Sequence, residues 1–480
     1  MCTNFDALTN PYKLTPYRDS ESGDSSASTN QIQAFCIALG ASTTWRLFGL
    51  GVSSNVATFF YKDLTTGGSH DLSDNSWGTT GNNTGASVAG YTLCVFYKNT
   101  GLVYGVYASG NIFSYDPTGG ASFNSSGHSL SYTTICQGVV HSKDDILYVG
   151  HDNKVLSYDG SSWVDAAITL PSNVYVTALA EYGNYLAIAC APLSGVGQSV
   201  VYLWDRDATL KTLPEIIQWG EGTIKVLHQI DSDLVGVSQY IGSYTTTDRV
   251  HIRYYSGSTP QTLVILQGAT GSTVLLQGSQ RIDNRILFSM SITLDGVLQR
   301  GVWSIGKSPD GRLALIHERT PNNDTAVASN DILGGFIKVG DYLFQTYTNS
   351  SDWAMSKTND QASFTATSEY KTVINPMQPE MYRASAGTRS NKKQLIAALL
   401  GIVPLPSGAS ASLYYRVDGG SWTLWGTANT TGQVALEVSQ VDVSGTAIST
   451  GREFEFKFTS TGGAEITEFK YKIELNETLL

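Results

Sequence analysis

Apolar stretches separated by short polar turns recur along most of the chain: an apolar strand, a turn of two or three polar residues, and a second apolar strand. The turn residues tolerate a positive φ or hydrogen-bond to their own backbone, which is what a tight hairpin needs. The clearest turns are Asp144-Asp145, Gly183-Asn184, Asp231-Ser232, Asp283-Asn284 and Gly340-Asp341. Two looser copies of the pattern cover residues 92–106 and 35–52. The pattern predicts a chain built from β-hairpins.

The hairpins are regularly spaced. When one apolar residue in the second strand of each copy is used as an anchor, the intervals are 56, 44, 39, 49, 52 and 56 residues. The anchors are Leu47, Val103, Leu147, Leu186, Val235, Leu287 and Leu343. A four-stranded propeller blade takes about 40–50 residues, so the spacing predicts an all-β fold with a seven-bladed β-propeller over residues 31–370. Six and eight blades are the alternatives. A chain of β-sandwiches would also show frequent hairpins, but the long period favours the propeller.

Aromatic residues mark the later strands of each repeat. A third strand often ends in an aromatic residue and an aspartate, as in the sequence KVLSYDG. A fourth element begins near Trp77, Phe123, Trp163 and Phe364, where we expect the ring to pack between blades. Residues 1–30 are polar and rich in serine, and seven blades are filled without them. We therefore expect them to form an external arm that becomes ordered only by docking, although the sequence leaves open whether they contribute a strand that closes the propeller ring.

Apolar and polar residues alternate strictly in the part of the chain that follows Tyr370. Phe454, Phe456 and Phe458 alternate with charged residues in the sequence REFEFKF, and the sequence FKYKIEL repeats the pattern. This period of two is the mark of a strand with one face in water. The sequence SLYYRVDGGSWTLWG adds a hairpin around an Asp-Gly-Gly turn. Residues 371–480 are therefore predicted to form a separate β-sandwich or jelly-roll domain.

Both ends of the chain carry motifs that resemble a known class of proteins. The sequences YYRVDGGSWTLWGT (residues 414–427) and GREFEFKFTSTGGAEITEFKYKIEL (residues 451–475) resemble the terminal sandwich of many tailed-bacteriophage structural proteins. The sequence NPYKLTPYRDSESGD (residues 10–24) is similar to the segment that leads into the propeller of phage tail-region proteins. The resemblance implies a virion protein of the tail or portal vertex, assembled in the host cytoplasm. Its implied partners are other virion proteins and further copies of the same chain, as a homo-oligomer.

Composition argues against several classes of function. The net charge is −11 and no basic cluster exceeds Lys392-Lys393, so a nucleic-acid-binding face is not expected. The longest apolar run, residues 395–405, is too short to span a bilayer, and the N-terminus lacks the pattern of a signal peptide. We therefore expect no membrane insertion. The five cysteines lie far apart, without the spacing of a zinc or redox site. We expect structural thiols in a protein that folds in a reducing compartment.

The sequence contains no motif of a catalytic or metal site. The seven histidines show no metal-ligand spacing such as HExxH, and no glycine-rich loop precedes a helix, so neither a metal nor another cofactor is expected. Propellers also carry sialidases, which need three arginines converging on a carboxylate. No motif ties three arginines together here, and the sequences DQASF and DGSSW are one residue shorter than the sialidase box. The arginines considered are Arg206, Arg249, Arg253, Arg281, Arg285, Arg300 and Arg312.

A long polar loop at residues 67–87 offers the one candidate for a binding site. It contains Trp77, whose ring we single out as a contact for a host-surface glycan. The alternative is that the loop contacts a neighbouring subunit or only solvent. We predict a non-enzymatic structural component of a phage virion, acting in assembly of the tail or tail vertex. The alternatives are a receptor- or glycan-binding protein of the tail tip or a fibre and, third, a propeller glycosidase.

Overall fold

The computed structural model describes residues 2–3, 5–6, 8, 13–18, 20–22, 31–40, 44–53, 56–65, 67–68, 70–74, 76–79, 93–106, 111–118, 123–130, 132, 134–194, 197–207, 209–240, 248–268, 274–294, 297–307, 311–319, 333–349, 352–358, 368–371, 393–448, 450–451 and 453–475. Within these ranges the protein is all-β and contains no helix. The chain divides into two compact units. The larger unit comprises Ser20–Val302 and Thr320–Thr358, and the smaller unit comprises Met1–Asp19, Trp303–Arg319 and Asn359–Leu480.

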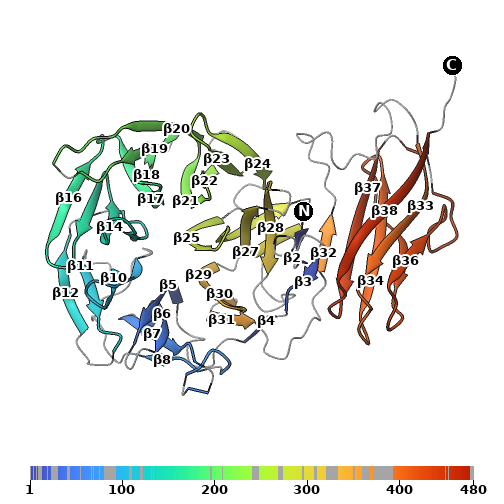
Figure 1. Cartoon of the computed structure of the whole chain (residues 1–480), viewed down its shortest axis with the longest axis horizontal. Coiled ribbons are helices and arrows are strands. Elements are labelled where there is room, and N and C mark those ends of the chain that lie inside the picture. The colour runs from blue at the N-terminus through green and yellow to red at the C-terminus, as the bar shows by residue number, and fades with distance from the viewer. Residues whose placement is uncertain are drawn as a thin grey trace. The chain divides into compact units, whose positions relative to one another are not determined.

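The larger unit contains several four-stranded antiparallel sheets whose strands mostly follow one another in chain order (Figure 1). The first sheet contains β5 (Gln31–Leu39), β6 (Trp45–Ser53), β7 (Val56–Asp63) and β8 (Gly78–Thr79). The second contains β9 (Cys94–Tyr97), β10 (Leu102–Val106), β11 (Asn111–Tyr115) and β12 (Phe123–Ser129). The third contains β13 (Val139–His141), β14 (Ile146–His151), β15 (Lys154–Tyr158) and β16 (Trp163–Thr169).

The remaining sheets of the larger unit repeat this arrangement. One contains β17 (Val174–Tyr182), β18 (Tyr185–Pro192), β19 (Gln198–Trp204) and β20 (Glu215–Glu221). The next contains β21 (Thr223–Ile230), β22 (Asp233–Tyr240), β23 (Arg249–Tyr255) and β24 (Gln261–Gln267). The hairpin of β25 (Val274–Ile282) and β26 (Arg285–Leu294) follows, and β27 (Val297–Lys307) passes from the larger unit into the smaller one. The last sheet contains β29 (Leu333–Val339), β30 (Tyr342–Asn349), β31 (Asp352–Thr358) and β4 (Ser20–Ser22).

The hairpin turns have the backbone conformation that their residues favour. Asp145, Asp231 and Asp283 have φ values of 52°, 51° and 49°, and Gly183 and Gly340 have φ values of 59° and 56°. These left-handed conformations are easier for glycine and aspartate than for most residues. Each residue belongs to one of the five clearest turns of the sequence, and the strands on either side pair as hairpins. The hairpins predicted at these five turns are therefore confirmed.

Neighbouring sheets of the larger unit pack against each other through their first strands. These strands are in contact in the pairs β5–β9, β13–β17, β17–β21, β21–β25 and β25–β29, and β29 contacts β5 again. One buried cluster joins Ile337 and Phe344 of the last sheet to Ile32 and Phe35 of the first. Thr346 Oγ1 also donates a hydrogen bond to the Ile32 carbonyl at 2.6 Å. The all-β fold of this unit is therefore propeller-like, with the first strands turned toward the centre (Figure 1).

A short strand from the start of the chain completes the last sheet. β4 runs antiparallel to β31, with Ser22 opposite Ser356 and Ser20 opposite Thr358. The prediction of an external arm is therefore wrong for these three residues, because their backbone supplies the fourth strand of a sheet of the larger unit. The fourth element expected near Phe364 lies outside the described residues.

The smaller unit combines strands from distant parts of the sequence. Six strands follow β25, β26 and β27 in a nine-stranded sheet. Their order is β28 (Leu313–Arg319), β1 (Cys2–Thr3), β32 (Ser368–Lys371), β37 (Phe454–Thr461), β34 (Ser410–Val417) and β35 (Thr423–Ala428). A second has the order β36 (Ala435–Val438), β33 (Lys393–Ile402) and β38 (Ile466–Leu475). β2 (Phe5–Asp6) pairs with β3 (Thr15–Pro16). Residues of the first twenty thus contribute to this unit as well as to the last sheet of the larger one.

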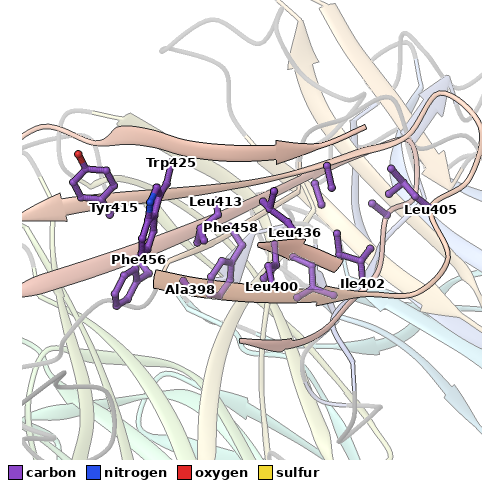
Figure 2. Close-up of a cluster of buried hydrophobic side chains, with 14 of the residues drawn as sticks. Ala398, Leu400, Ile402, Leu405, Leu413, Tyr415, Trp425, Leu436, Phe456 and Phe458 are labelled. Carbon is purple, nitrogen blue, oxygen red and sulfur yellow. The ribbon is translucent and has the colours of Figure 1, made fainter. Parts of the chain in front are cut away.

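A single apolar cluster forms the core of the smaller unit. Phe454, Phe456 and Phe458 are 1%, 4% and 3% exposed, and they belong to a cluster that includes Leu400 and Trp425 (Figure 2). The alternation predicted for the sequence REFEFKF is therefore confirmed for its apolar face.

The opposite face of β37 is less exposed to solvent than the alternation in its sequence predicts. Glu455 is only 8% exposed, because Arg416 Nη2 forms an ion pair with its carboxylate at 2.6 Å. The Arg416 guanidinium in turn lies 4.7 Å from the centre of the Trp422 ring. An aromatic ring and a paired cation thus cover part of the face that the sequence pattern assigns to water.

Candidate functional site

The clearest concave site lies among the first strands of four neighbouring sheets of the larger unit. It has a cavity volume of about 280 Å³ and is lined from β13, β17, β21 and β25 and the residues just before β13. The lining residues are 137–140, 177–181, 225, 227–229, 279 and 281. Because these strands face the centre of the propeller-like unit, the cavity lies on its inner side (Figure 1).

The cavity is lined by two cationic side chains and one carboxylate, contributed by Lys225, Arg281 and Glu181. Lys225 is half-buried, and this burial lowers the pKa of its ammonium group. Glu181 is already engaged: its Oε1 accepts a hydrogen bond from the Ser142 backbone N–H and lies 3.8 Å from His141 Nδ1. At neutral pH the two cations therefore face one anion, which is itself hydrogen-bonded.

His228 adds a neutral polar group to the same wall. Its Nε2 lies 2.6 Å from Ser279 Oγ, so the two side chains hydrogen-bond across the β21–β25 boundary. Burial, together with the nearby charge of Arg281, lowers the pKa of His228 to about 4. The imidazole is therefore uncharged at neutral pH and can either donate or accept one hydrogen bond at Nδ1, depending on its tautomer.

These groups do not form the constellation of a glycoside hydrolase. Most such enzymes use two carboxyl groups, one on either side of the scissile bond, although sialidases use a tyrosine nucleophile. Among the described lining residues Glu181 is the one carboxylate, and its oxygen is held by the Ser142 N–H. The described lining instead presents positive charge and hydrogen-bond donors.

The cavity does not gather the three arginines that a sialidase-like site would need. Of the seven considered in the sequence, Arg281 alone lines the cavity in the described part of the chain. Arg206 Nε pairs with Asp144 at 3.2 Å, and Arg253 donates to the Glu221 carbonyl at 3.1 Å. Arg300 is buried on β27 at 3% exposure. The described lining of the cavity therefore contains no arginine triad.

Trp77 does not occupy the position expected of a glycan-binding residue. Its side chain is only 4% exposed and lies in a cluster with Phe35 and Phe344, whose ring centres are 6.0 Å and 5.8 Å away. Lys62 Nζ lies 5.6 Å from the centre of the ring. A sugar needs an exposed ring face to stack on, so the selection of Trp77 is corrected to a core residue. The end of its loop, residues 80–87, lies outside the described residues.

The histidine pair on the β13–β14 hairpin has structural roles. His141 Nε2 lies 3.2 Å from the Tyr185 carbonyl oxygen, and Arg206 Nη1 lies 2.6 Å from Nδ1 and 2.8 Å from Nε2. The Lys143 N–H donates to Nδ1 at 3.3 Å. His151 Nε2 lies 2.9 Å from the Asp165 carbonyl. Within the described ranges, no three His, Cys, Asp or Glu side chains are grouped closely enough to hold a metal ion.

Four cysteines are free thiols inside the larger unit. Cys94, Cys136 and Cys190 are buried, and Cys36 is partly buried with its Sγ 3.4 Å from Cys94 Sγ. Burial raises the pKa of Cys136 to about 12 and raises that of Cys36 well above its usual value. Thiols in this state are poor nucleophiles, which agrees with the structural role expected from the sequence.

Some of the cavity residues can be recognised in the sequence as a row of polar residues at equivalent positions of successive hairpins, although no single motif identifies them. Glu181, Gln229 and Arg281 occupy the same place in three successive first strands, each paired with the second residue of the following strand. Comparing equivalent positions of the hairpin copies would have identified this polar row. Within its own strand each of the three is an ordinary polar residue near a hairpin turn, so a single strand gives no sign of the row.

Comparisons with known proteins leave the chain unassigned. No protein-family profile matches it, and no curated protein is similar to it in sequence. One similar solved structure is a glycoside hydrolase, with 10% identity, a TM-score of 0.28 and coverage of 95% of this chain and 100% of that one.

Two further solved structures are similar over smaller parts of the chain. One is a humanized mutant of the Chaetomium thermophilum Polycomb Repressive Complex 2, with 8% identity, a TM-score of 0.35 and coverage of 62% of this chain and 72% of that one. The other is KlHsv2 with loop 6CD replaced by a Gly-Ser linker, with 9% identity, a TM-score of 0.38 and coverage of 73% of this chain and 95% of that one.

Among the described residues no helix is long and apolar enough to pass through a bilayer.

Proposed function

We propose that the chain is a non-enzymatic structural component of a tailed-phage virion, built from a seven-bladed β-propeller and a C-terminal β-sandwich. Seven first strands support the blade count: β5, β9, β13, β17, β21, β25 and β29 each begin a new hairpin. Two sheets with one shared apolar core support the sandwich. The motifs that resemble phage proteins coincide with strands of this core, in β34, β35, β37 and β38.

The observation that carries the proposal is the closure of the last sheet by the start of the chain. β4 pairs with β31, so the sheet that contacts the first one is held by both ends of the larger unit. Radial repetition with a closed ring leaves only short edges and makes a rigid body. A rigid body without paired catalytic carboxylates in its described cavity is suited to an assembly role.

The proposed partners are other virion proteins of the tail or portal vertex and further copies of this chain. The proposed location is the virion, after assembly in the host cytoplasm. A direct test is quantitative mass spectrometry of purified particles from a host that produces the chain. We expect the chain in intact particles at five, six or twelve copies or a multiple of these, as ring symmetry requires. Its absence from purified particles would overturn the proposal.

A receptor- or glycan-binding role at the tail tip or on a fibre is the second proposal. The cationic cavity favours it, since Lys225 and Arg281 line a concave site. An isolated protein that binds host cells, and particles labelled at their distal end by an antibody to this chain, would favour this role over a purely structural one. A glycosidase remains the third and least supported alternative, because its two carboxyl groups are not both present among the described lining residues.

A further inference from the structure

We propose that the cavity between β13 and β25 is a binding site for a small organic monoanion, a carboxylate of about the size of one sugar acid. The site is built from Lys225, Arg281, His228 and Ser279. This inference goes beyond the structural role proposed above and does not depend on it.

The side chains that line the cavity carry a net positive charge. Lys225 and Arg281 contribute two positive charges and Glu181 contributes one negative charge among the described lining residues. The net charge of one positive unit matches a ligand with one negative charge. A doubly charged phosphate would leave a surplus of negative charge in a partly desolvated site, which is unfavourable.

Lys225 places a partly buried ammonium group in the wall of the cavity. Among the described residues no hydrogen bond or ion pair satisfies its Nζ, although the side chain is half-buried and burial lowers its pKa. Partial burial disfavours the charged form of this ammonium group, and a carboxylate bound in the cavity would stabilise that form. The cation is therefore placed for a partner that the chain itself does not supply.

Arg281, His228 and Ser279 supply hydrogen-bonding groups in the same wall. Arg281 is exposed, and its one hydrogen bond uses Nε, which lies 3.4 Å from the Asp283 carbonyl. Its terminal nitrogens remain able to receive a carboxylate in the two-point geometry that guanidinium groups favour. The neutral His228 and Ser279 Oγ, which are 2.6 Å apart, supply uncharged polar contacts suited to hydroxyl groups. A cavity of about 280 Å³ lies at the lower end of ligand pockets, which points to a small ligand.

Titration calorimetry of the full chain tests the site with three probes: D-glucuronate, D-glucose and inorganic phosphate. We expect saturable binding of glucuronate, none of glucose, and weaker binding of phosphate than of glucuronate. Lys225→Met is expected to weaken glucuronate binding by about tenfold or more, and Arg281→Gln, at an exposed position, by several-fold. Lys211→Met is the control, because Lys211 lies outside the cavity with its Nζ 3.3 Å from the Ala166 carbonyl, and it is expected to bind like the wild type.

The outcomes separate the proposal from its competitors. Glucuronate binding that Lys225→Met and Arg281→Gln leave unchanged would overturn it, as would the absence of saturable binding at millimolar glucuronate. Tighter binding of phosphate than of glucuronate would overturn the assignment to a monoanion. If Lys225→Met fails to fold, Arg281→Gln decides, because an exposed side chain does not support the core. Failure of this site leaves the virion proposal standing, since particle composition tests that proposal separately.

Discussion

Ser22 lies directly opposite Ser356 in an antiparallel pair of strands, although the two residues come from the two ends of the larger unit. The pairing makes the start of the chain the fourth strand of the last sheet. The same sheet contacts the first one through β29 and β5. The unit is therefore closed by a non-local contact that forms only once most of the chain is in place.

Two truncations isolate the contribution of this closing strand. Removing residues 1–18 leaves β4 intact, whereas removing residues 1–22 deletes it. We expect the longer truncation to lose about 2–3 kcal/mol more stability in the last sheet, because each backbone hydrogen bond contributes about 1 kcal/mol. Hydrogen exchange of the amides of β31 measures this locally. Equal protection of β31 in both truncated proteins would contradict the closure.

Trp77 is predicted to contribute to stability and not to sugar binding. Its ring lies among Phe35 and Phe344 at 4% exposure, so Trp77→Ala should cost about 3–5 kcal/mol of unfolding free energy. Trp45, at 48% exposure, is the control, and Trp45→Ala should cost much less. Urea denaturation of the two variants provides the comparison. A Trp77→Ala protein as stable as Trp45→Ala would show that the ring is not buried.

Gly150 allows two sheets to approach closely. A Cβ at this position would lie 2.7 Å from Cys136 Sγ and closer still to Val176 Cγ1, which belongs to the next sheet. Gly150→Ala should therefore destabilise the protein by about 1–3 kcal/mol through overpacking. Gly278→Ala is the matched control, since a Cβ there meets no atom within 4 Å. Thermal melts that rank the two variants in the opposite order would refute this packing.

Stability is predicted to fall as the pH drops below the usual pKa of histidine. Burial, followed by the charge of Arg253, lowers the pKa of His251 to about 4, whereas the same group in the unfolded chain titrates near 6.5. Between these two pKa values His251 is protonated in the unfolded chain and neutral in the folded protein. The free energy of unfolding therefore decreases as the pH falls. Below about pH 4 both states are protonated and this effect ends.

Replacement of His251 by glutamine tests the assignment. His251→Gln should flatten the decrease in stability between about pH 7 and pH 5, relative to the wild type. His228, whose pKa is also lowered to about 4, should still contribute a decrease of its own. Identical slopes in the two proteins, measured by urea denaturation at each pH, would show that His251 is not responsible.

The sequence predicts local features of this fold better than its distant contacts. The turns at Asp145, Asp231 and Asp283 were predictable because aspartate itself favours the left-handed conformation found there. The closing strand was not, because the three residues Ser-Glu-Ser carry no apolar periodicity and pair only with a strand far along the chain. The local conformational preferences of these three residues do not identify the distant strand with which they pair.

The same limit applies to the candidate site. Trp77 stands in a polar stretch of sequence, which suggested a glycan contact. Its ring instead packs between the first and last sheets, as expected for the start of a fourth element. Lys225 and His228 were missed because each is one polar residue within an otherwise ordinary strand. Only the packing of four first strands brings them together with Ser279 and Arg281.

Imaging of phage particles at side-chain resolution would show both where the chain lies and how it folds. We expect ordered copies in the tail region, each with seven four-stranded blades and with residues 20–22 as the fourth strand of the last one. Particles that lack the chain, or copies whose last sheet is completed by another segment, would contradict this expectation.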